Sequence, residues 1–250
     1  MNTNQFPQLE ISLLFEKSLP YLKAWKIQSI IIYLLTILYL SIPSFQIPML
    51  EYSHFRITSL MQQRAIEHIL LFYPRQEWLS IDDVNPKLLK GIISMEDGRF
   101  FQHMGIDWKE LNTALKVNKR RGRAVRGGST LTMQLAKNLY LTTKKSIIRK
   151  AKEFLITIRM EKELSKRAIL QNYINAVEWG DGIFGIKEAS EIYFNKEPWQ
   201  LTTNECAKLA AVIPSPLVHA PNKNSVYVLR RSSIILGRLN DIILFPKTVK

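Results

Sequence analysis

The sequence has little cysteine and little acidic charge. Only Cys206 is a cysteine among its 250 residues, which excludes a disulfide framework within the chain and an all-cysteine metal site. We predict that Cys206 is a small buried residue, because free cysteine usually packs as an apolar group. The 21 acidic residues are outnumbered by 35 lysines and arginines, and the net charge is +14. This excess predicts an anionic partner such as a phosphate, a membrane surface or a nucleic acid.

The chain also lacks an internal repeat, a Ser/Gly-rich linker and a long stretch of alternating apolar and polar residues. These absences exclude repeat architectures and count against an extensive sheet. A chain of 250 residues can bury a substantial core. The fold class that we predict is therefore mainly α, with one large domain.

One long apolar run is present near the amino terminus. Residues 27–42 carry no charge, and with their apolar neighbours they reach about 20 residues, the length of a membrane-spanning helix. The residues after the run offer no small-x-small cleavage pattern, which favours an uncleaved anchor over a secretory signal. Three lysines precede the run and few positive charges follow it, so the amino terminus should be cytoplasmic. The prediction is a cytoplasmic segment over residues 1–24, a transmembrane anchor over 25–44 and an extracytoplasmic domain over 45–250.

Two helix starts are recognisable in the predicted domain. Asn85 before Pro86 is typical of an N-cap followed by proline at the first helical position, and this helix should bring Glu96 near its carboxyl end. Thr202 and Glu205 are spaced as a capping box, and the apolar stretch after them ends before Pro214. Residues 44–75 show no clean period and predict a juxtamembrane segment that packs on the domain or on lipid.

Glu96 and Asp97 form an acidic pair at the expected end of that helix. A sugar hydroxyl is a poor nucleophile, and a carboxylate within hydrogen-bond reach is the usual group that takes its proton as a bond forms. The residues alone prefer neither acid, since both would need a partly desolvated site to raise their pKa. His103 follows in the same stretch, although a lone histidine is more often structural than catalytic.

Gly127, Gly128, Ser129 and Thr130 precede a helical apolar pattern and predict a turn that leads into a helix amino terminus. Such a terminus offers backbone N–H groups and a positive dipole end to an anion, and the glycines let a ligand approach. Taken alone, the turn indicates only a capped helix. Lys137 lies about two helical turns further on and would add a positive charge for a diphosphate.

Lys145, Arg149 and Glu153 are spaced by four and predict two cations and a carboxylate on one helix face. Taken alone, this face would be a solvated one with a weak ion pair. The opposite, core-facing stripe is expected to consist of Ile147, Ala151, Phe154 and Ile158.

A basic cluster lies between residues 116 and 126. It has the charge of a nucleic-acid-binding segment, but it lacks interleaved aromatic residues and any recognised DNA or RNA module. We predict a basic loop near anionic lipid headgroups and no nucleic-acid partner. The cluster consists of Lys116, Lys119, Arg120, Arg121, Arg123 and Arg126.

Taken in order, these motifs resemble those of the monofunctional peptidoglycan glycosyltransferases, the membrane-anchored transglycosylases of bacterial cell-wall synthesis. The similarity runs from about residue 79 to residue 239, and the stretch of residues 178–185 resembles the stand-alone enzymes more than the bifunctional penicillin-binding proteins. Met133 and Lys145 depart from the family's usual glutamine and arginine. The five matching blocks are Glu96-Asp97-x-x-Phe100-x-x-His103-x-Gly105, Gly127-Gly128-Ser129-Thr130-x-Thr132-x-Gln134, Arg149-Lys150-x-x-Glu153, Lys166-x-x-Ile169-Leu170-x-x-Tyr173-x-Asn175 and Arg231-x-x-x-Ile235-Leu236.

The resemblance implies a lysozyme-like α-helical fold with a small membrane-proximal jaw lobe. It implies that a glycan growing on undecaprenyl pyrophosphate is the donor and lipid II the acceptor, joined by a β-1,4 bond with inversion. Glu96 would be the general base, and Glu153 would assist at the leaving group directly or through a divalent cation such as Mg or Mn, with no cofactor obligatory. The diphosphate would be held by Lys137, Lys145 and Arg149, with further substrate contacts from His103, Ser129, Thr130, Gln134 and Asn138.

The same resemblance implies a place in the bacterial inner membrane, with a periplasmic catalytic domain and with cell-wall synthesis or division proteins as partners. Two other classes of function stay open. A lysozyme-like hydrolase would use a glutamate as an acid to cleave glycan, although a row of cations has no purpose for an uncharged leaving group. A basic membrane scaffold without activity would tolerate Glu96→Asp.

Overall fold

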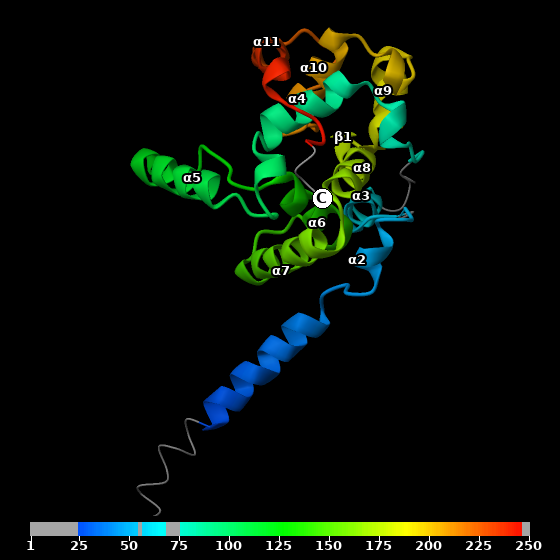
Figure 1. Cartoon of the computed structure of the whole chain (residues 1–250). Coiled ribbons are helices and arrows are strands. Elements are labelled where there is room, and N and C mark those ends of the chain that lie inside the picture. The colour runs from blue at the N-terminus through cyan, green and yellow to red at the C-terminus, as the bar shows by residue number, and fades with distance from the viewer. Residues whose placement is uncertain (1–24, 55–56, 69–75, 247–250) are drawn as a thin grey trace, which may run out of the picture. The chain divides into compact units, whose positions relative to one another are not determined.

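Figure 1 shows the computed structural model of the chain, which describes residues 25–54, 57–68 and 76–246. The chain divides into two compact units, Met1–Ile42 and Pro43–Lys250. The three-part organisation expected from the sequence stays a prediction.

The first unit contains a helix over residues 25–40. Within the described ranges, no helix combines the length and the apolar character needed to cross a membrane. The described residues thus do not show the spanning helix that the sequence predicts over residues 25–44. The predicted cytoplasmic segment over residues 1–24 lies outside the described residues.

The second unit is mainly helical, which confirms the predicted class. Its α-helices are α2 (Gln46–Met49), α3 (Ser59–Glu67), α4 (Pro86–Glu96), α5 (Trp108–Arg121), α6 (Leu131–Tyr140), α7 (Ile147–Glu163), α8 (Lys166–Ala176), α9 (Ile186–Phe194), α10 (Thr203–Val212) and α11 (Val226–Arg238). Short 3-10 helices cover Ile81–Asp83, Phe100–Gln102, Pro198–Gln200 and Leu239–Asp241. The strands β1 (Glu178–Gly180) and β2 (Ile183–Phe184) form an antiparallel pair that the sequence did not predict, because segments this short show no alternation.

The two predicted helix starts are confirmed. The side chain of Asn85 accepts a hydrogen bond from the Lys87 amide, and Pro86 opens α4. Thr202 and Glu205 form the capping box of α10, which ends at Val212. Cys206 on this helix is fully buried, as expected, and burial raises the pKa of its thiol to about 12.

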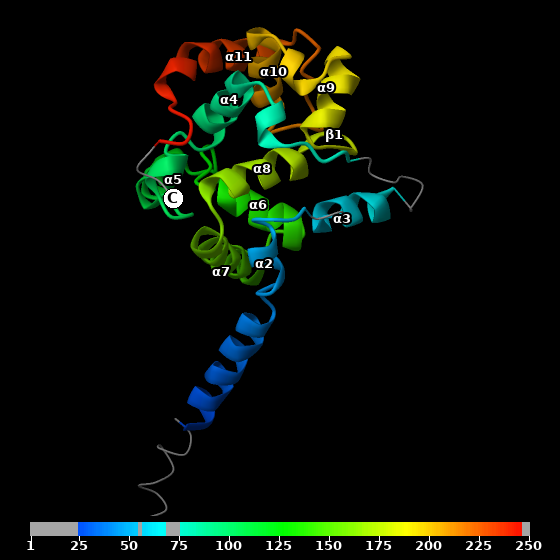
Figure 2. The same ribbon diagram turned by 45° about the vertical axis from the view of Figure 1, so that its right-hand side comes forward.

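The helices of the second unit pack in two groups that Figures 1 and 2 show from two sides. One group consists of α4, α10 and α11, and the other of α6, α7 and α8, with α3 packed on α6 and α2 on α7. Residues 44–75 were expected to pack on the domain, and α2 and α3 do so. Leu60 and Met61 of α3 are buried together with Phe184 of β2. Glu96 ends α4, so it lies where the first group meets the second.

The basic cluster differs from the predicted loop. Four of its residues, Lys116 to Arg121, belong to the last turns of α5, which ends at Gly122 in the left-handed conformation. Asn118 accepts hydrogen bonds from the amides of Val125 and Arg126, so the turn after the helix is folded back on it. Because lysine and arginine favour the negative end of a helix dipole, a cationic last turn is compatible with a helix.

Candidate active site

Glu96 is the carboxylate that the fold presents to a cleft. Its side chain is half-buried, and its Oε2 accepts a hydrogen bond of 2.8 Å from Gln134 Nε2 on α6. Tyr173 Oη on α8 donates to Gln134 Oε1 at 3.0 Å and so fixes the direction of the amide. Loss of hydration raises the pKa of Glu96, against the opposing effects of this hydrogen bond and of the charges on Arg231 and Lys137.

Asp97 has a different environment, although it is the next residue. Its side chain is buried, and Oδ1 is 2.8 Å from His103 Nε2. Oδ2 accepts a hydrogen bond of 3.0 Å from the backbone N–H of Leu131, the first residue of α6. Both oxygens are therefore used within the protein, and of the two acids left open by the sequence Glu96 is the one with an oxygen, Oε1, that no described residue hydrogen-bonds.

These contacts change two expectations. His103, expected to contact substrate, is buried behind Asp97 and does not line the cleft. The anion at the amino terminus of α6 is the protein's own Asp97, which binds the N–H of Leu131. Thr130 caps the same terminus by accepting from the Met133 amide, and it donates to the carbonyl of Gly105 at 2.5 Å. The turn thus joins α4 to α6, and its residues, the predicted Ser129 and Thr130 among them, line the cleft described next.

The cleft beside Glu96 has a volume of about 640 Å³ and lies between the two helix groups. Its wall includes the carboxyl end of α4, the turn before α6, Gln134 and two arginines of α11. Four arginines line it, namely Arg99, Arg126, Arg231 and Arg238. Arg99 is paired with Asp107 at 2.9 Å and Arg126 with Glu110 at 2.7 Å.

Arg231 was not predicted as a site residue. It lies on α11 with its guanidinium 5.3 Å from the ring centre of Tyr227, and Nη2 is 2.9 Å from the sulfur of Met95. Its buried Nε has no hydrogen-bond partner among the described residues. The sequence did single out Arg231, because it is the first residue of the fifth matching block. No other residue of that block suggested a chemical role for the arginine.

A smaller cavity of about 190 Å³ adjoins the cleft, since Gln134 and Pro214 line both. Lys137 and Asn138 of α6 line the smaller cavity. Burial lowers the pKa of the half-buried Lys137, and Glu153 acts in the opposite direction. Asn138 is buried, and its Oδ1 has no hydrogen-bond partner in the described part of the chain. The cavity therefore offers a cation and an unused acceptor next to Glu96.

The predicted cationic face of α7 is present in part, but it faces the core and not the solvent. Glu153, Ile156, Thr157 and Met160 are buried, whereas Ile147 is 89 % and Ile158 52 % exposed. The predicted core stripe was wrong because the buried face carries polar groups that are satisfied internally, for example the Thr157 hydroxyl, which donates to the Glu153 carbonyl.

Glu153 binds two cations on this buried face. One carboxylate oxygen is 2.5 Å from Arg149 and the other 2.5 Å from Lys150. Lys150 also donates to the hydroxyl of Ser129 at 3.1 Å and so connects α7 to the turn before α6. Glu153 lines neither the cleft nor the smaller cavity, but its charge and those of Arg149 and Lys150 act on Lys137.

Lys145 does not share this helix face. The N-cap of α7 is Ser146, so Lys145 precedes the helix, and its side chain is exposed. The spacing of four predicted a common face only if the helix had begun earlier, and the cap of Ser146, which accepts from the Arg149 amide, fixes the start. Met133, the other departure from the family pattern, is a buried core residue.

The residues around Glu153 do not fit a divalent cation. Both of its oxygens bind cationic side chains, and the described residues contain no group of three histidine, cysteine or acidic side chains that could hold a metal ion. No chemical step is therefore assigned to a metal.

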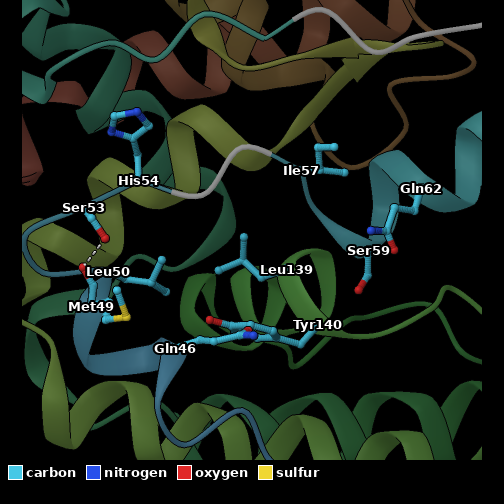
Figure 3. A pocket seen from close by; sticks show the side chains of 10 residues that line it. All are labelled: Gln46, Met49, Leu50, Ser53, His54, Ile57, Ser59, Gln62, Leu139 and Tyr140. Atoms are coloured by element: carbon cyan, nitrogen blue, oxygen red, sulfur yellow. Dashed lines mark hydrogen bonds between the residues drawn. The ribbon is translucent and has the colours of Figure 1, made fainter.

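A further cavity of about 450 Å³ lies among α2, α3 and the end of α6. Figure 3 shows Leu139 and Tyr140 near its centre, with Leu50 to their left and His54 above Leu50. None of the predicted site residues lines this cavity.

A half-buried carboxylate in a cleft that arginines line, with a lysine in the adjoining cavity, is an arrangement suited to a group-transfer enzyme with an anionic leaving group. Comparison with known proteins agrees with this class. Residues 62–240 match the family model described as Transglycosylase. The chain is 40 % identical over 168 residues to the biosynthetic peptidoglycan transglycosylase of Laribacter hongkongensis, covering 67 % of this chain and 74 % of the relative.

Two other relatives carry the same description. The protein of Aromatoleum aromaticum is 44 % identical over 173 residues, covering 67 % of this chain and 75 % of the relative. The protein of Mannheimia succiniciproducens is 35 % identical over 189 residues, covering 74 % and 77 %. The chain belongs to the transglycosylase family, and it is a glycosyltransferase of peptidoglycan synthesis.

Proposed function

We propose that this glycosyltransferase polymerises lipid II into β-1,4-linked glycan, with Glu96 as general base and with inversion at the anomeric carbon. The donor is the glycan chain on undecaprenyl pyrophosphate, and the acceptor is the sugar hydroxyl of lipid II. The proposal joins the activity in the names of the relatives to the chemistry of the cleft.

The observation that carries the proposal is the position of Glu96. Its Oε2 accepts from Gln134, and its Oε1 remains for an acceptor hydroxyl. A raised pKa makes an ionised carboxylate a stronger base, and burial raises the pKa of Glu96. The neighbouring Asp97 has no such oxygen, because His103 and the Leu131 amide use both.

The cationic side of the site supports the choice of a diphosphate leaving group. Lys137 lies in the cavity that shares Gln134 with the cleft. Arg149 and Lys150 are held by Glu153, so we assign Glu153 the task of positioning these cations at the leaving-group side. Fixed positive charges stabilise the negative charge that develops as the bond to phosphate breaks.

In the proposed step, the acceptor hydroxyl gives its proton to Glu96 while its oxygen attacks the anomeric carbon. The bond from that carbon to the diphosphate oxygen breaks, and the electron pair leaves with the polyprenyl pyrophosphate. Attack from the face opposite the leaving group converts the α-linked donor into a β-linked product.

The test is an assay with fluorescently labelled lipid II and, in parallel, with intact cell-wall sacculi. Elongated glycan strands with lipid II, and no soluble fragments from sacculi, are expected. Release of muropeptides from sacculi would assign the hydrolase function instead. An inactive protein, together with an unchanged phenotype of Glu96→Asp in cells, would favour the membrane scaffold.

We further propose that the amino-terminal segment attaches the chain to the bacterial inner membrane and that the second unit acts on the periplasmic side. The support is the uncharged run of residues 27–42 and the lipid-linked nature of the proposed substrates. Full-length protein should pellet with membranes and stay there in high salt and alkaline carbonate. Release by either treatment would contradict an integral anchor.

A further inference from the structure

An ion pair outside the proposed reaction forms one wall of the Lys137 cavity. Arg64 of α3 donates from Nε and Nη2 to the two oxygens of Glu178 in β1, at 2.8 and 2.9 Å. The side chains of Arg64 and Glu178 are only 16 % and 6 % exposed. Arg64 also binds Glu67 at 2.6 Å. Such a two-pronged pair fixes the position of both side chains.

A contribution to the stability of the fold does not account for this ion pair. The same cavity is lined by Leu60, Val177, Ile213 and Leu217, which are apolar. Removing two charges from water costs free energy that their attraction only partly restores, so a buried ion pair is weak evidence for a stabilising role. Glu178 also begins the stretch in which the sequence resembles the stand-alone enzymes, and the proposed reaction gives that residue no task.

Lys137 is the group on which the pair can act. The charged groups that act on Lys137 or share its cavity come from four elements: Glu153, Arg149 and Lys150 of α7, Glu178 of β1, Arg64 of α3 and Glu96 of α4. Burial lowers the pKa of Lys137, while Glu153 and Glu178 raise it. Glu153 acts on Lys137 from outside the cavity, whereas Glu178 lines the cavity together with Lys137.

We propose that Arg64 and Glu178 are positioning residues that keep Lys137 charged and available to an anionic substrate. Glu178 adds a negative charge, from the cavity side, to that of Glu153 and so favours the ammonium form of the lysine. Arg64 occupies both oxygens of Glu178, so the carboxylate does not form its own salt bridge with Lys137 and withdraw it from the substrate. The inference rests on the proposed function, in which Lys137 binds the diphosphate of the donor.

The two single variants have opposite expected effects. Glu178→Gln removes a negative charge and leaves the charge of Arg64 near Lys137, so the lysine loses its proton at lower pH. Arg64→Gln releases Glu178 toward Lys137, so the lysine keeps its proton to higher pH but is partly sequestered. The alkaline limb of kcat/KM for labelled lipid II should move to lower pH in the first variant and to higher pH in the second. The Arg64 variant should also raise KM at neutral pH.

The control for action through Lys137 is the same pair of changes in a Lys137→Arg background. Arginine does not titrate in this range, so both shifts should disappear there. Glu163→Gln, which removes an ion pair of 3.2 Å with Arg159 on α7 away from the cavity, should leave the pH profile of the wild type unchanged.

A purely structural ion pair predicts another result: both variants lose thermal stability and activity, with no movement of the alkaline limb. That result, shifts in the same direction, or shifts that persist with Lys137→Arg would overturn the inference. If Glu178→Gln does not fold, Arg64→Gln and Arg64→Lys decide, because the conservative change should restore the wild-type limb. Failure of the wild type to elongate lipid II would instead contradict the proposed function.

Discussion

Replacing Glu96 by glutamine separates a catalytic base from a structural carboxylate. Glutamine has nearly the same shape, and its amide oxygen can still accept the hydrogen bond that Gln134 donates at 2.8 Å. The change therefore removes the basic oxygen while the contact between α4 and α6 is kept. We expect lipid II polymerisation to fall at least about 100-fold, the lower range for a general base, which corresponds to about 2.7 kcal/mol of activation free energy.

Stability should move in the other direction. The pKa of Glu96 is raised in the folded state, so folding favours the protonated form, and stability falls as pH rises from the unfolded to the folded pKa. At neutral pH the ionised Glu96 is thus a cost that Glu96→Gln removes. At pH 7, thermal unfolding of the variant should occur at the wild-type temperature or above it. In acid, where Glu96 is protonated in the folded and the unfolded state, this advantage of the variant should vanish.

The first assay measures conversion of labelled lipid II under single-turnover conditions, with the enzyme in excess. The second is a thermal melt at several pH values. In the wild type, kcat/KM should decline in acid through a pKa above the usual value of glutamate. A variant that keeps more than about a tenth of the rate would remove Glu96 from the base role. A variant that melts well below the wild type would show that the carboxylate supports the fold instead.

Four further variants test neighbouring contacts. Asp97→Asn should lower the free energy of unfolding by about 1 to 3 kcal/mol in urea titrations, because one amide oxygen cannot replace two carboxylate oxygens in a buried network. Glu153→Gln should raise the KM for the donor more than it lowers kcat, since two cations lose the carboxylate that holds them. Tyr173→Phe should move the acid limb of kcat/KM to higher pH, because the amide that lowers the pKa of the base loses its fixed direction. Lys145→Ala should change the KM by less than about twofold, because this side chain is exposed and precedes α7.

The parts of the fold that local chemistry determines were predictable from the sequence. Asn85 and Pro86 mark the start of α4, and Thr202 and Glu205 mark the start of α10, because caps satisfy backbone groups within a few residues. The pairing of β1 with β2 was not predictable, since it depends on contacts that only the packed domain supplies.

The sequence named several residues of the candidate site, but it did not predict how they are arranged. The face of α7 was assigned by apolar residues, yet the buried face holds Glu153, whose charge is compensated by Arg149 and Lys150. A periodicity rule treats a buried carboxylate as solvent-exposed, so it inverted the helix. Arg64 lies far from every matching block in the sequence and enters the site only because α3 packs on α6.

The separate roles of Glu96 and Asp97 follow from where α4 ends. Glu96 is the last helical residue, so its side chain stays on the helix face that meets Gln134. Asp97 is the C-cap with φ of −160° and ψ of 68°, and its side chain leaves the helical direction toward His103 and the first amide of α6. The negative charge of Asp97 in turn raises the pKa of Glu96. A single break in helical geometry therefore gives two neighbouring carboxylates different environments: Asp97 is a structural anchor, and Glu96, the proposed base, has a proton affinity that this anchor increases.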